Sequence, residues 1–207
     1  MLYLKENKTP LSAVVFDLGN VMFDYNPRRF MFELGIDQKY YDRLEEVFPK
    51  SSEWQDLDEN IITDDEFLAR ALEKEPMLKK EILAYHYHWK EHCTALPYNV
   101  ATFYDIKDAG AKTYILSNYQ QTGFEYAEEH NIFLHDFDGA VISYRCKMRK
   151  PNPAIYKLLI DTYALDPAHT VFFDDLPANI EAARAAGLLG VVLPPCGHIA
   201  EYLEFES

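Results

Sequence analysis

The sequence predicts an α/β protein in which a doubly wound parallel sheet carries an inserted α-helical domain. Short apolar runs without polar alternation are typical of parallel strands that are buried on both faces. Helical segments separate the later runs, and this alternation of strand and helix favours a parallel sheet. The chain of 207 residues is long enough for one such domain together with a smaller insert.

Five apolar runs bounded by turn residues predict the strands. They are AVVF at 13–16, TYIL at 113–116, AVI at 140–142, TVFF at 170–173 and GVVL at 190–193. Helices are expected at 99–109, 121–130, 153–163 and 177–186. The last two open with a proline, which suits the first helical position, and Gly110 and Gly187 stand where glycine commonly ends a helix.

Residues 28–95 interrupt this rhythm, because they contain no convincing strand. Thr63 and Glu66 have the spacing of a capping box, and apolar residues then recur at helical spacing. A further helix is expected at 78–89. We therefore expect an α/β core made of 1–26 and 96–207, and an α-helical cap made of 27–95.

The charge and cysteine content of the chain exclude several kinds of partner and site. A protein with a formal net charge of −14 repels nucleic acid and anionic lipid, so we expect neither as a partner. The three cysteines are widely spaced and offer neither a disulfide framework nor a CxxC metal pair. The N-terminus lacks a signal-peptide pattern, and no apolar stretch approaches the roughly eighteen residues of a membrane span, so we expect a cytoplasmic protein.

Ligands of open parallel sheets bind beyond the carboxyl ends of the strands, and this chain places polar side chains there. In chain order they are Asp17, Ser117, Asn118, Lys150, Asp174 and Asp175. Each alone has an ordinary explanation, such as a turn aspartate, a helix N-cap or a surface lysine. Together they offer a nucleophile, phosphate donors, a charge-balancing lysine and two carboxylates that a hard divalent cation would compensate.

These motifs, FDLGNV, LSN, RKP and FFDD in this order, resemble those of the haloacid dehalogenase superfamily. The resemblance spans residues 13–194, and the helical insert is similar to the small α-helical cap of that family. Within the superfamily the motif wording is similar to that of bacterial α-D-glucose-1-phosphate phosphatases. The resemblance implies a Mg²⁺-dependent phosphatase acting on a small phosphate ester, with a sugar phosphate as the expected substrate.

The resemblance also implies roles for the strand-end residues. Asp17 would attack phosphorus and form an aspartyl-phosphate, which water then hydrolyses. Mg²⁺ would be held by Asp17, the backbone carbonyl of Gly19 and Asp175, with Asp174 binding directly or through water. Ser117, Asn118 and Lys150 would hold the transferring phosphoryl group, and Lys150 would neutralise charge.

One position departs from the family pattern. Two residues after the nucleophile the family usually has a second aspartate, which protonates the leaving group and later activates water, and here that residue is Gly19. Asp24 is a candidate replacement, although a turn residue is an equally good interpretation. The missing acid disfavours a mutase and suits a leaving group of low pKa, such as the anomeric hydroxyl of a sugar 1-phosphate.

Three other functions remain open: a 2-haloacid dehalogenase, a β-phosphoglucomutase-like enzyme, and a non-catalytic phosphometabolite-binding protein. The acidic pair argues against the first and Gly19 against the second. Five residues near the start of the cap and after Ser117 are candidates to contact the substrate, although packing explains each as well. They are Tyr25, Asn26, Arg28, Tyr119 and Gln120. His86, His88 and His92 share a predicted helix, but no HExxH motif is present and we do not expect a zinc site there. The acidic tail EYLEFES is expected to be solvated.

Overall fold

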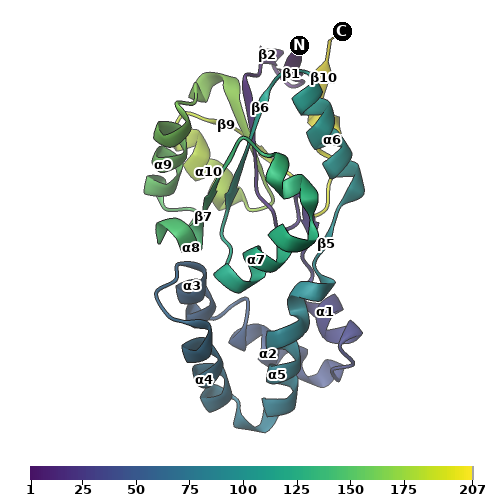
Figure 1. Cartoon of the computed structure of the whole chain (residues 1–207), viewed down its shortest axis with the longest axis vertical. Coiled ribbons are helices and arrows are strands. Elements are labelled where there is room, and N and C mark those ends of the chain that lie inside the picture. The colour runs from purple at the N-terminus through teal and green to yellow at the C-terminus, as the bar shows by residue number, and fades with distance from the viewer. Residues whose placement is uncertain (207) are drawn as a thin grey trace.

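The computed structural model describes residues 1–206, and its centre is a five-stranded parallel sheet in the order β7-β6-β3-β8-β9. The strands are β3 (Ala13–Phe16), β6 (Lys112–Ser117), β7 (Gly139–Ile142), β8 (Thr170–Asp174) and β9 (Leu189–Val192). Helices lie on both faces (Figure 1). The predicted α/β class and the five predicted strands are confirmed, and no strand end shifts by more than one residue.

The register of the sheet aligns the carboxyl ends of its three inner strands. Phe16, the last residue of β3, lies beside Ile115 of β6 and Phe173 of β8. The backbone N–H of Asp17 continues the ladder and donates to the carbonyl of Phe173 at 2.9 Å. The side chains that follow β3, β6 and β8 therefore emerge at one edge, as the sequence predicts for a parallel sheet.

Two apolar cores hold the helices against the sheet, because alternate residues of each strand point to opposite faces. Val15 and Phe172 face α9 (Pro153–Tyr163) and α10 (Pro177–Ala185). Phe16 and Phe173 face the other way, toward α6 (Pro97–Asp108). The remaining core helices are α7 (Gln121–His130) and α8 (Ser143–Cys146). Prolines open α6, α9 and α10, as expected where the first N–H has no helical partner.

Of the helices between β3 and β6 in the sequence, the first five gather below the sheet in Figure 1. They are α1 (Pro27–Glu33), α2 (Tyr41–Val47), α3 (Ser52–Asp58), α4 (Asp64–Lys74) and α5 (Lys79–His88). The predicted capping box opens α4, with Thr63 and Glu66 exchanging side-chain and backbone hydrogen bonds. Short 3₁₀ turns at Gln38–Tyr40, Pro76–Leu78 and Trp89–His92 connect them. Further 3₁₀ turns occur at Ile132–Asp136, Pro167–His169 and Ile199–Tyr202.

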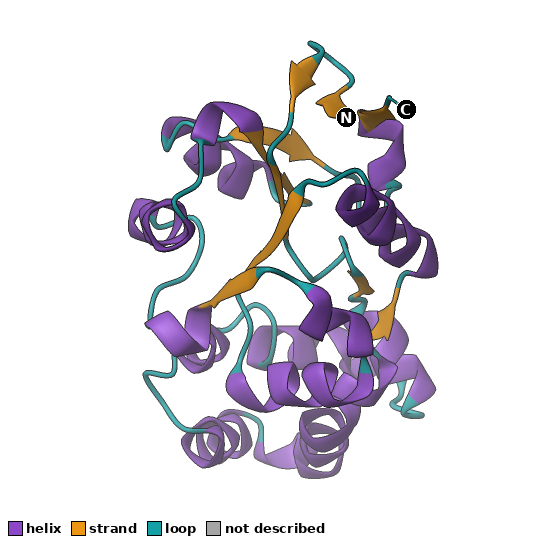
Figure 2. Cartoon of the chain, turned by 45° about the horizontal axis from the view of Figure 1, so that its top comes forward, coloured by secondary structure: helices purple, strands orange, loops and turns teal. Residues whose placement is uncertain are grey.

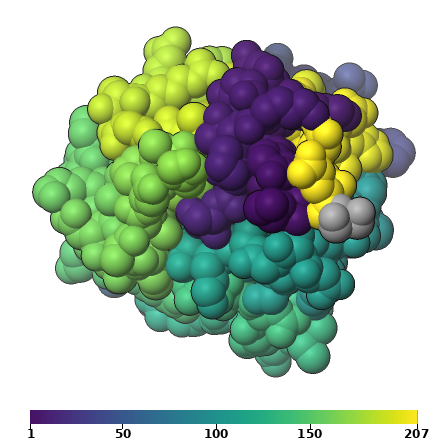
Figure 3. All heavy atoms as spheres, turned by 90° about the horizontal axis from the view of Figure 1, so that it is seen from above, coloured from purple at the N-terminus to yellow at the C-terminus, as the bar shows by residue number. Residues whose placement is uncertain are grey.

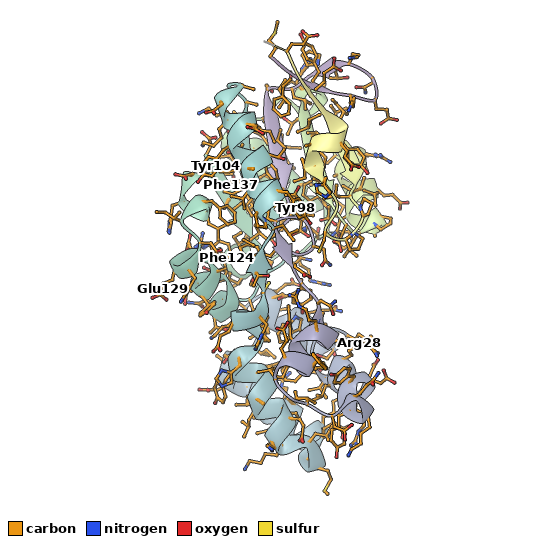
Figure 4. The ribbon with its side chains drawn as sticks, turned by 90° about the vertical axis from the view of Figure 1, so that its right-hand side faces the viewer. Arg28, Tyr98, Tyr104, Phe124, Glu129 and Phe137 are labelled. Atoms are coloured by element: carbon orange, nitrogen blue, oxygen red, sulfur yellow. The ribbon has the colours of Figure 1, made fainter. Side chains whose placement is uncertain are left out.

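The chain enters and leaves this helical cap through a two-stranded ribbon. β4 (Phe23–Asp24) pairs antiparallel with β5 (Thr94–Ala95), which corrects the expectation that 28–95 holds no strand. A strand of two residues is too short to leave a periodic pattern in sequence. Figure 4 shows Arg28 on the helical cap, well separated from Tyr98 and Tyr104 on α6. The ribbon lies next to the predicted cap limits, and we propose that it marks them.

A small antiparallel sheet in the order β10-β1-β2 closes the opposite end of the molecule. It consists of β1 (Leu2–Leu4), β2 (Thr9–Pro10) and β10 (Leu203–Phe205). The purple N-terminal segment and the yellow C-terminal segment accordingly lie side by side in Figure 3. The expectation of a solvated acidic tail is wrong for Leu203, which is buried, because the tail pairs with β1. In Figure 2 this sheet lies at the top of the molecule and the cap helices lie at the bottom.

Candidate active site

A cleft of about 290 Å³ lies where the carboxyl edge of the sheet meets the cap. From the core it is lined by Asp17, Gly19, Asn20, Asn118, Tyr119, Gln120, Arg149, Lys150, Asp175, Leu176 and Asn179. From the cap and its ribbon it is lined by Tyr25, Pro49, Trp54, Gln55, Asp58, Trp89 and Cys93. Any ligand at the sheet edge is therefore enclosed by both parts of the molecule.

Asp17 is held with one carboxylate oxygen fully engaged and the other open. Its Oδ1 accepts from the N–H of Leu18 at 2.7 Å, from Oγ of Ser117 at 2.9 Å and from Nζ of Lys150 at 2.9 Å. Its Oδ2 accepts no hydrogen bond from residues 1–206. Three donors on one oxygen fix the orientation of the carboxylate, so Oδ2 is the atom available to a cation or to an electrophile.

Lys150 is 1% exposed and lies between two carboxylates. Its Nζ is 2.9 Å from Oδ1 of Asp17 and 2.7 Å from Oδ2 of Asp174, and it sits over the ring of Phe172 at 5.2 Å. Burial lowers the pKa of this ammonium group, but attraction to Asp17 and Asp174 outweighs burial and raises the pKa above its ordinary value. The lysine is therefore a fixed positive charge beside Asp17.

The two adjacent aspartates after β8 occupy different surroundings. Asp174 is fully buried, and its oxygens accept from Lys150, from the side chain of Asn179 and from the N–H of Leu176. Asp175 is partly exposed in the cleft, and its carboxylate accepts only from Nδ2 of Asn20, at 2.9 Å, among the residues described. Asp174 is thus committed to the protein, whereas Asp175 keeps open lone pairs.

The carboxylates of Asp17, Asp174 and Asp175 form the one cluster within residues 1–206 that has the spacing of a metal site. Their nearest ligand atoms all lie within 4.8 Å of one another. Burial raises the pKa of Asp17 to about 7, although the charge of Lys150 lowers it. Three acidic groups face a single buried ammonium group, so this donor set fits a hard divalent cation, which prefers oxygen ligands.

The side chain of Asn118, which is predicted to hold the ligand, also bonds to the loop that carries Lys150. Its Oδ1 accepts from the backbone N–H of Lys150 at 2.8 Å, and its Nδ2 donates to the carbonyl of Lys150 at 3.0 Å. One amide hydrogen stays free, but the main role of Asn118 is to fix the loop that carries the lysine. Ser117 matches its predicted place at the end of β6, with its hydroxyl on Asp17.

The family model for haloacid dehalogenase-like hydrolases matches residues 11–187. The chain belongs to this family. The sesquiterpene phosphatase astK of Aspergillus oryzae is 24% identical over 186 residues, which cover 89% of this chain and 91% of that protein. At this coverage the match extends over both the sheet and the cap, and not only over the motifs.

Solved structures of haloacid dehalogenase-like proteins have the same fold. A HAD family enzyme of Bacteroides thetaiotaomicron, solved with magnesium and inorganic phosphate, matches with a TM-score of 0.74 at 21% identity, over 92% of this chain and 98% of its own. The L-2-haloacid dehalogenase of Xanthobacter autotrophicus, solved with chloropropionic acid covalently bound, matches with a TM-score of 0.64 at 16% identity, over 88% and 77%. No helix among residues 1–206 is long and apolar enough to cross a bilayer.

In this haloacid dehalogenase-like hydrolase the loop after Asp17 does not need a glycine for its shape. Gly19 has no left-handed backbone angle, and a Cβ built on it would meet only the Cβ of Tyr25, at 3.8 Å. The left-handed residue is Asn20, with φ of 58°. Asp24, the predicted substitute acid, lies in β4 and pairs with Arg29, and it does not line the cleft. That position argues against an acid role for Asp24.

The cap wall of the hydrolase contains residues that the motifs do not point to. Trp54, Trp89 and Asp58 are buried and line the cleft beside Gln55. Helical spacing in the sequence identifies such residues only as packing or surface positions. Of the predicted contact residues, the cleft includes Tyr25, Tyr119 and Gln120.

Other predicted candidates lie elsewhere in the hydrolase. Arg28 pairs with Asp42 and Glu45 on the cap, and Asn26 caps α1. The three histidines each face a different carboxylate, which agrees with the interpretation that they do not form a metal cluster. The pairs are His86 with Asp64, His88 with Glu91, and His92 with Glu33.

Proposed function

We propose that this chain is a Mg²⁺-dependent phosphatase that hydrolyses a small phosphorylated metabolite through an aspartyl-phosphate on Asp17. The observation that carries the proposal is the state of the Asp17 carboxylate. Three donors hold Oδ1 and leave Oδ2 free, and a carboxylate oxygen of Asp17 lies within 4.8 Å of oxygens of Asp174 and Asp175. A carboxylate fixed beside both a lysine and an acidic cluster suits attack on a phosphoryl group.

Asp17, Asp175 and the carbonyl of Gly19 would hold the magnesium ion in this proposal. Asp174 would act on the metal only indirectly, because its oxygens already accept from Lys150, Asn179 and Leu176. When bound, Mg²⁺ would supply a Lewis acid that draws charge from the phosphate and from Asp17. The fit rests on the donor set, three carboxylates around one ammonium group, rather than on the family alone.

The chain's own residues account for the transfer. One carboxylate oxygen of Asp17 bonds to phosphorus as the bond from phosphorus to the substrate's ester oxygen breaks. Lys150 holds its positive charge 2.9 Å from Asp17 and balances the charge that gathers on the phosphoryl oxygens. Ser117 keeps Oδ1 of Asp17 in place, so that the carboxylate cannot turn away from the incoming phosphorus. Water then cleaves the acyl phosphate and regenerates Asp17.

We further propose a sugar phosphate as substrate. The cleft combines the aromatic rings of Trp54 and Trp89 with polar groups, and this mixture suits a hydroxylated ring. Nε2 of Gln120 is buried without a hydrogen-bond partner among the residues described, so a ligand hydroxyl can satisfy it. The volume of about 290 Å³ suits a small substrate. One relative is named as a sesquiterpene phosphatase, so a prenyl phosphate is the competing substrate against which a sugar phosphate must be compared.

Phosphate release from a panel of esters tests the proposal. The panel holds p-nitrophenyl phosphate, hexose 1- and 6-phosphates and a prenyl phosphate, each with and without Mg²⁺. We expect release only with Mg²⁺, none from Asp17→Asn, and a higher kcat/KM for a hexose phosphate than for the prenyl phosphate. An acid quench of a single turnover with labelled substrate should trap the label on wild-type protein.

The same panel separates the rivals. Chloride release from 2-chloropropionate without metal would favour the dehalogenase interpretation. Interconversion of hexose 1- and 6-phosphates would favour a mutase. Binding of Mg²⁺ and phosphate without turnover of any ester would favour a binding protein. Preference for the prenyl phosphate would keep the phosphatase mechanism and overturn the sugar assignment.

A further inference from the structure

The proposed reaction lacks a proton donor among the residues that the family pattern points to. An alkoxide is a poor leaving group, so a phosphatase acting on an alkyl or sugar ester needs an acid near the ester oxygen. Gly19 has no side chain that can supply one. Asp24 is paired with Arg29 in the ribbon and lies outside the cleft. The acid must come from another part of the chain that reaches the same space.

Asp58 is the one carboxylate that the cap contributes to the cleft lining. It is the last residue of α3, and its backbone carbonyl accepts from Oγ of Ser143 at 2.6 Å, which ties this helix end to the core. The residue is 8% exposed, yet its carboxylate accepts no hydrogen bond from any residue between 1 and 206. Its oxygens are not closed off from the cleft, so they keep lone pairs that a ligand bound there can reach.

Charged and titratable groups from several elements face Asp58. They are Arg149 after α8, Glu59 on its own segment, Asp17 after β3, Tyr25 after β4 and Tyr119 after β6. Burial raises the pKa of Asp58 to about 7, with Arg149 opposing the rise and the two acids adding to it. A carboxyl group that ionises near neutral pH can both give and take a proton under the same conditions.

Arg149 itself is placed by the cap. Its Nη1 donates to Oε1 of Gln55 on α3 at 3.1 Å, one turn before Asp58. Its Nε is buried and has no partner among the residues described. An unpartnered carboxylate and an unpartnered guanidinium N–H thus line one cleft that also contains Asp17. Both groups have capacity left for a substrate that bridges sheet and cap.

We propose that Asp58 of the cap is the general acid and base of the reaction, taking the place that Gly19 leaves open. The proposal rests on the phosphatase function proposed above. As Asp17 bonds to phosphorus, the ester oxygen leaves phosphorus and takes the proton of the Asp58 carboxyl group, which releases the alcohol. Asp58, now a carboxylate, takes a proton from the water that attacks the acyl phosphate. Asp17 leaves as a carboxylate, inorganic phosphate is released, and Asp58 is protonated again.

Leaving-group dependence tests this role in the full chain with Mg²⁺. A nitrophenolate leaves without protonation, whereas an alkoxide does not. We expect Asp58→Asn to lower kcat for a primary alkyl phosphate by about 100-fold or more and for p-nitrophenyl phosphate by less than about 5-fold. The basic limb of the pH–kcat profile for the alkyl ester should disappear. Asp56→Asn, a matched change on α3 outside the cleft lining, should leave both rates unchanged.

A second variant tests whether the missing element is the acid. There is room for a side chain at Gly19, so Gly19→Asp can be added to Asp58→Asn. We expect the double variant to recover at least about 10-fold of the lost alkyl phosphatase rate. Carbon-13 NMR of the Asp58 carboxyl group in the metal-free protein offers a readout independent of turnover, and it should titrate close to neutral pH.

Several outcomes would overturn the assignment. An equal loss for both esters, or a rise in KM at constant kcat, would mean that Asp58 binds the substrate without transferring its proton. If Asp58→Asn hydrolysed both esters at wild-type rates, Asp58 would have no part in the mechanism. In each of these cases the proposed function is tested separately, by phosphate release that wild type shows and Asp17→Asn lacks. These outcomes for Asp58 therefore leave the proposed function intact. Absence of release from every ester in wild type would instead defeat the phosphatase proposal itself.

Discussion

The side chain of Asn118 makes two hydrogen bonds to the backbone of Lys150: it accepts from the N–H at 2.8 Å and donates to the carbonyl at 3.0 Å. The end of β6 is thereby bonded to the loop that carries the lysine, although 32 positions separate the two residues. The Nζ atom that meets Asp17 owes its position to this pair. A residue predicted to contact phosphate thus also supports the lysine that lies beside Asp17.

Replacing Asn118 should therefore affect both stability and rate. Asn118→Ala removes two part-buried hydrogen bonds and leaves the backbone groups of Lys150 unpaired. We expect the free energy of unfolding to fall by about 1–3 kcal/mol in urea titrations. Phosphate release should slow by about 10-fold at unchanged Mg²⁺ affinity, because the lysine loses its fixed position. Gln121→Ala, three residues along on an exposed helix face, should change neither; equal effects from the two variants would contradict this account.

The two aspartates after β8 should separate folding from metal binding. Asp174→Asn leaves Lys150 short of one buried partner, so we expect a loss of about 3 kcal/mol in unfolding free energy without metal. Asp175→Asn should change metal-free stability by less than about 0.5 kcal/mol, because Asp175 is partly exposed. In wild type, Mg²⁺ at 100 times its Kd should add about 2.7 kcal/mol. That gain should be absent in Asp175→Asn, and scanning calorimetry with and without Mg²⁺ measures both effects.

Asp58 should make the stability of the metal-free protein depend on pH. Its pKa rises from an ordinary value of 3.8 to about 7 on folding, so the folded state binds more protons between these values. Unfolding free energy should then fall as pH rises through this window, by no more than about 4 kcal/mol. Asp58→Asn cannot ionise, so it should match wild type below pH 4 and exceed it above pH 7. Parallel curves for the two proteins in urea titrations would show that the carboxyl group is not perturbed.

Two glycines should respond in opposite ways to alanine. At Gly19 the new Cβ finds ordinary contact at 3.8 Å, so Gly19→Ala should gain about 0.4–1 kcal/mol in stability through a less flexible unfolded chain. At Gly139 the new Cβ would overlap the ring of Tyr163, which hydrogen bonds to Ala140 hold in place. Gly139→Ala should lose about 1–3 kcal/mol. Thermal melts compare the pair, and a destabilised Gly19→Ala would mean that the loop needs its glycine.

The sheet could be predicted because its strands are buried on both faces and therefore carry unbroken apolar runs. Val15 and Phe16 point to opposite cores, yet both are fully buried. The order of the strands could not be read in the same way, since it depends on pairings such as Phe16 with Ile115 across long separations. The strand-end residues were nevertheless predictable, because every parallel strand in such a sheet ends at one edge.

The cap half of the cleft could not be predicted from the same reasoning. Asp58 belongs to an acidic helical segment, and in sequence it is indistinguishable from solvated neighbours such as Glu59. Its burial appears only when α3 docks against the core through Ser143. The bonds from the Asn118 side chain to Lys150 could not be predicted for a related reason, because they join distant parts of the chain and leave no local pattern.

The ribbon of β4 and β5 also affects how the cap of such a protein can evolve. Phe23 faces Ala95 and Asp24 faces Thr94, so the two crossings between core and cap are neighbours bonded to each other. A segment whose ends meet in this way can be exchanged for another of different length and composition without opening the sheet. Selection can then remodel the cap wall of the cleft, Asp58 included, while the strand ends that carry Asp17 and Lys150 stay in place. We expect exchange of the cap at this ribbon to change which ligands the cleft admits while the sheet keeps its register.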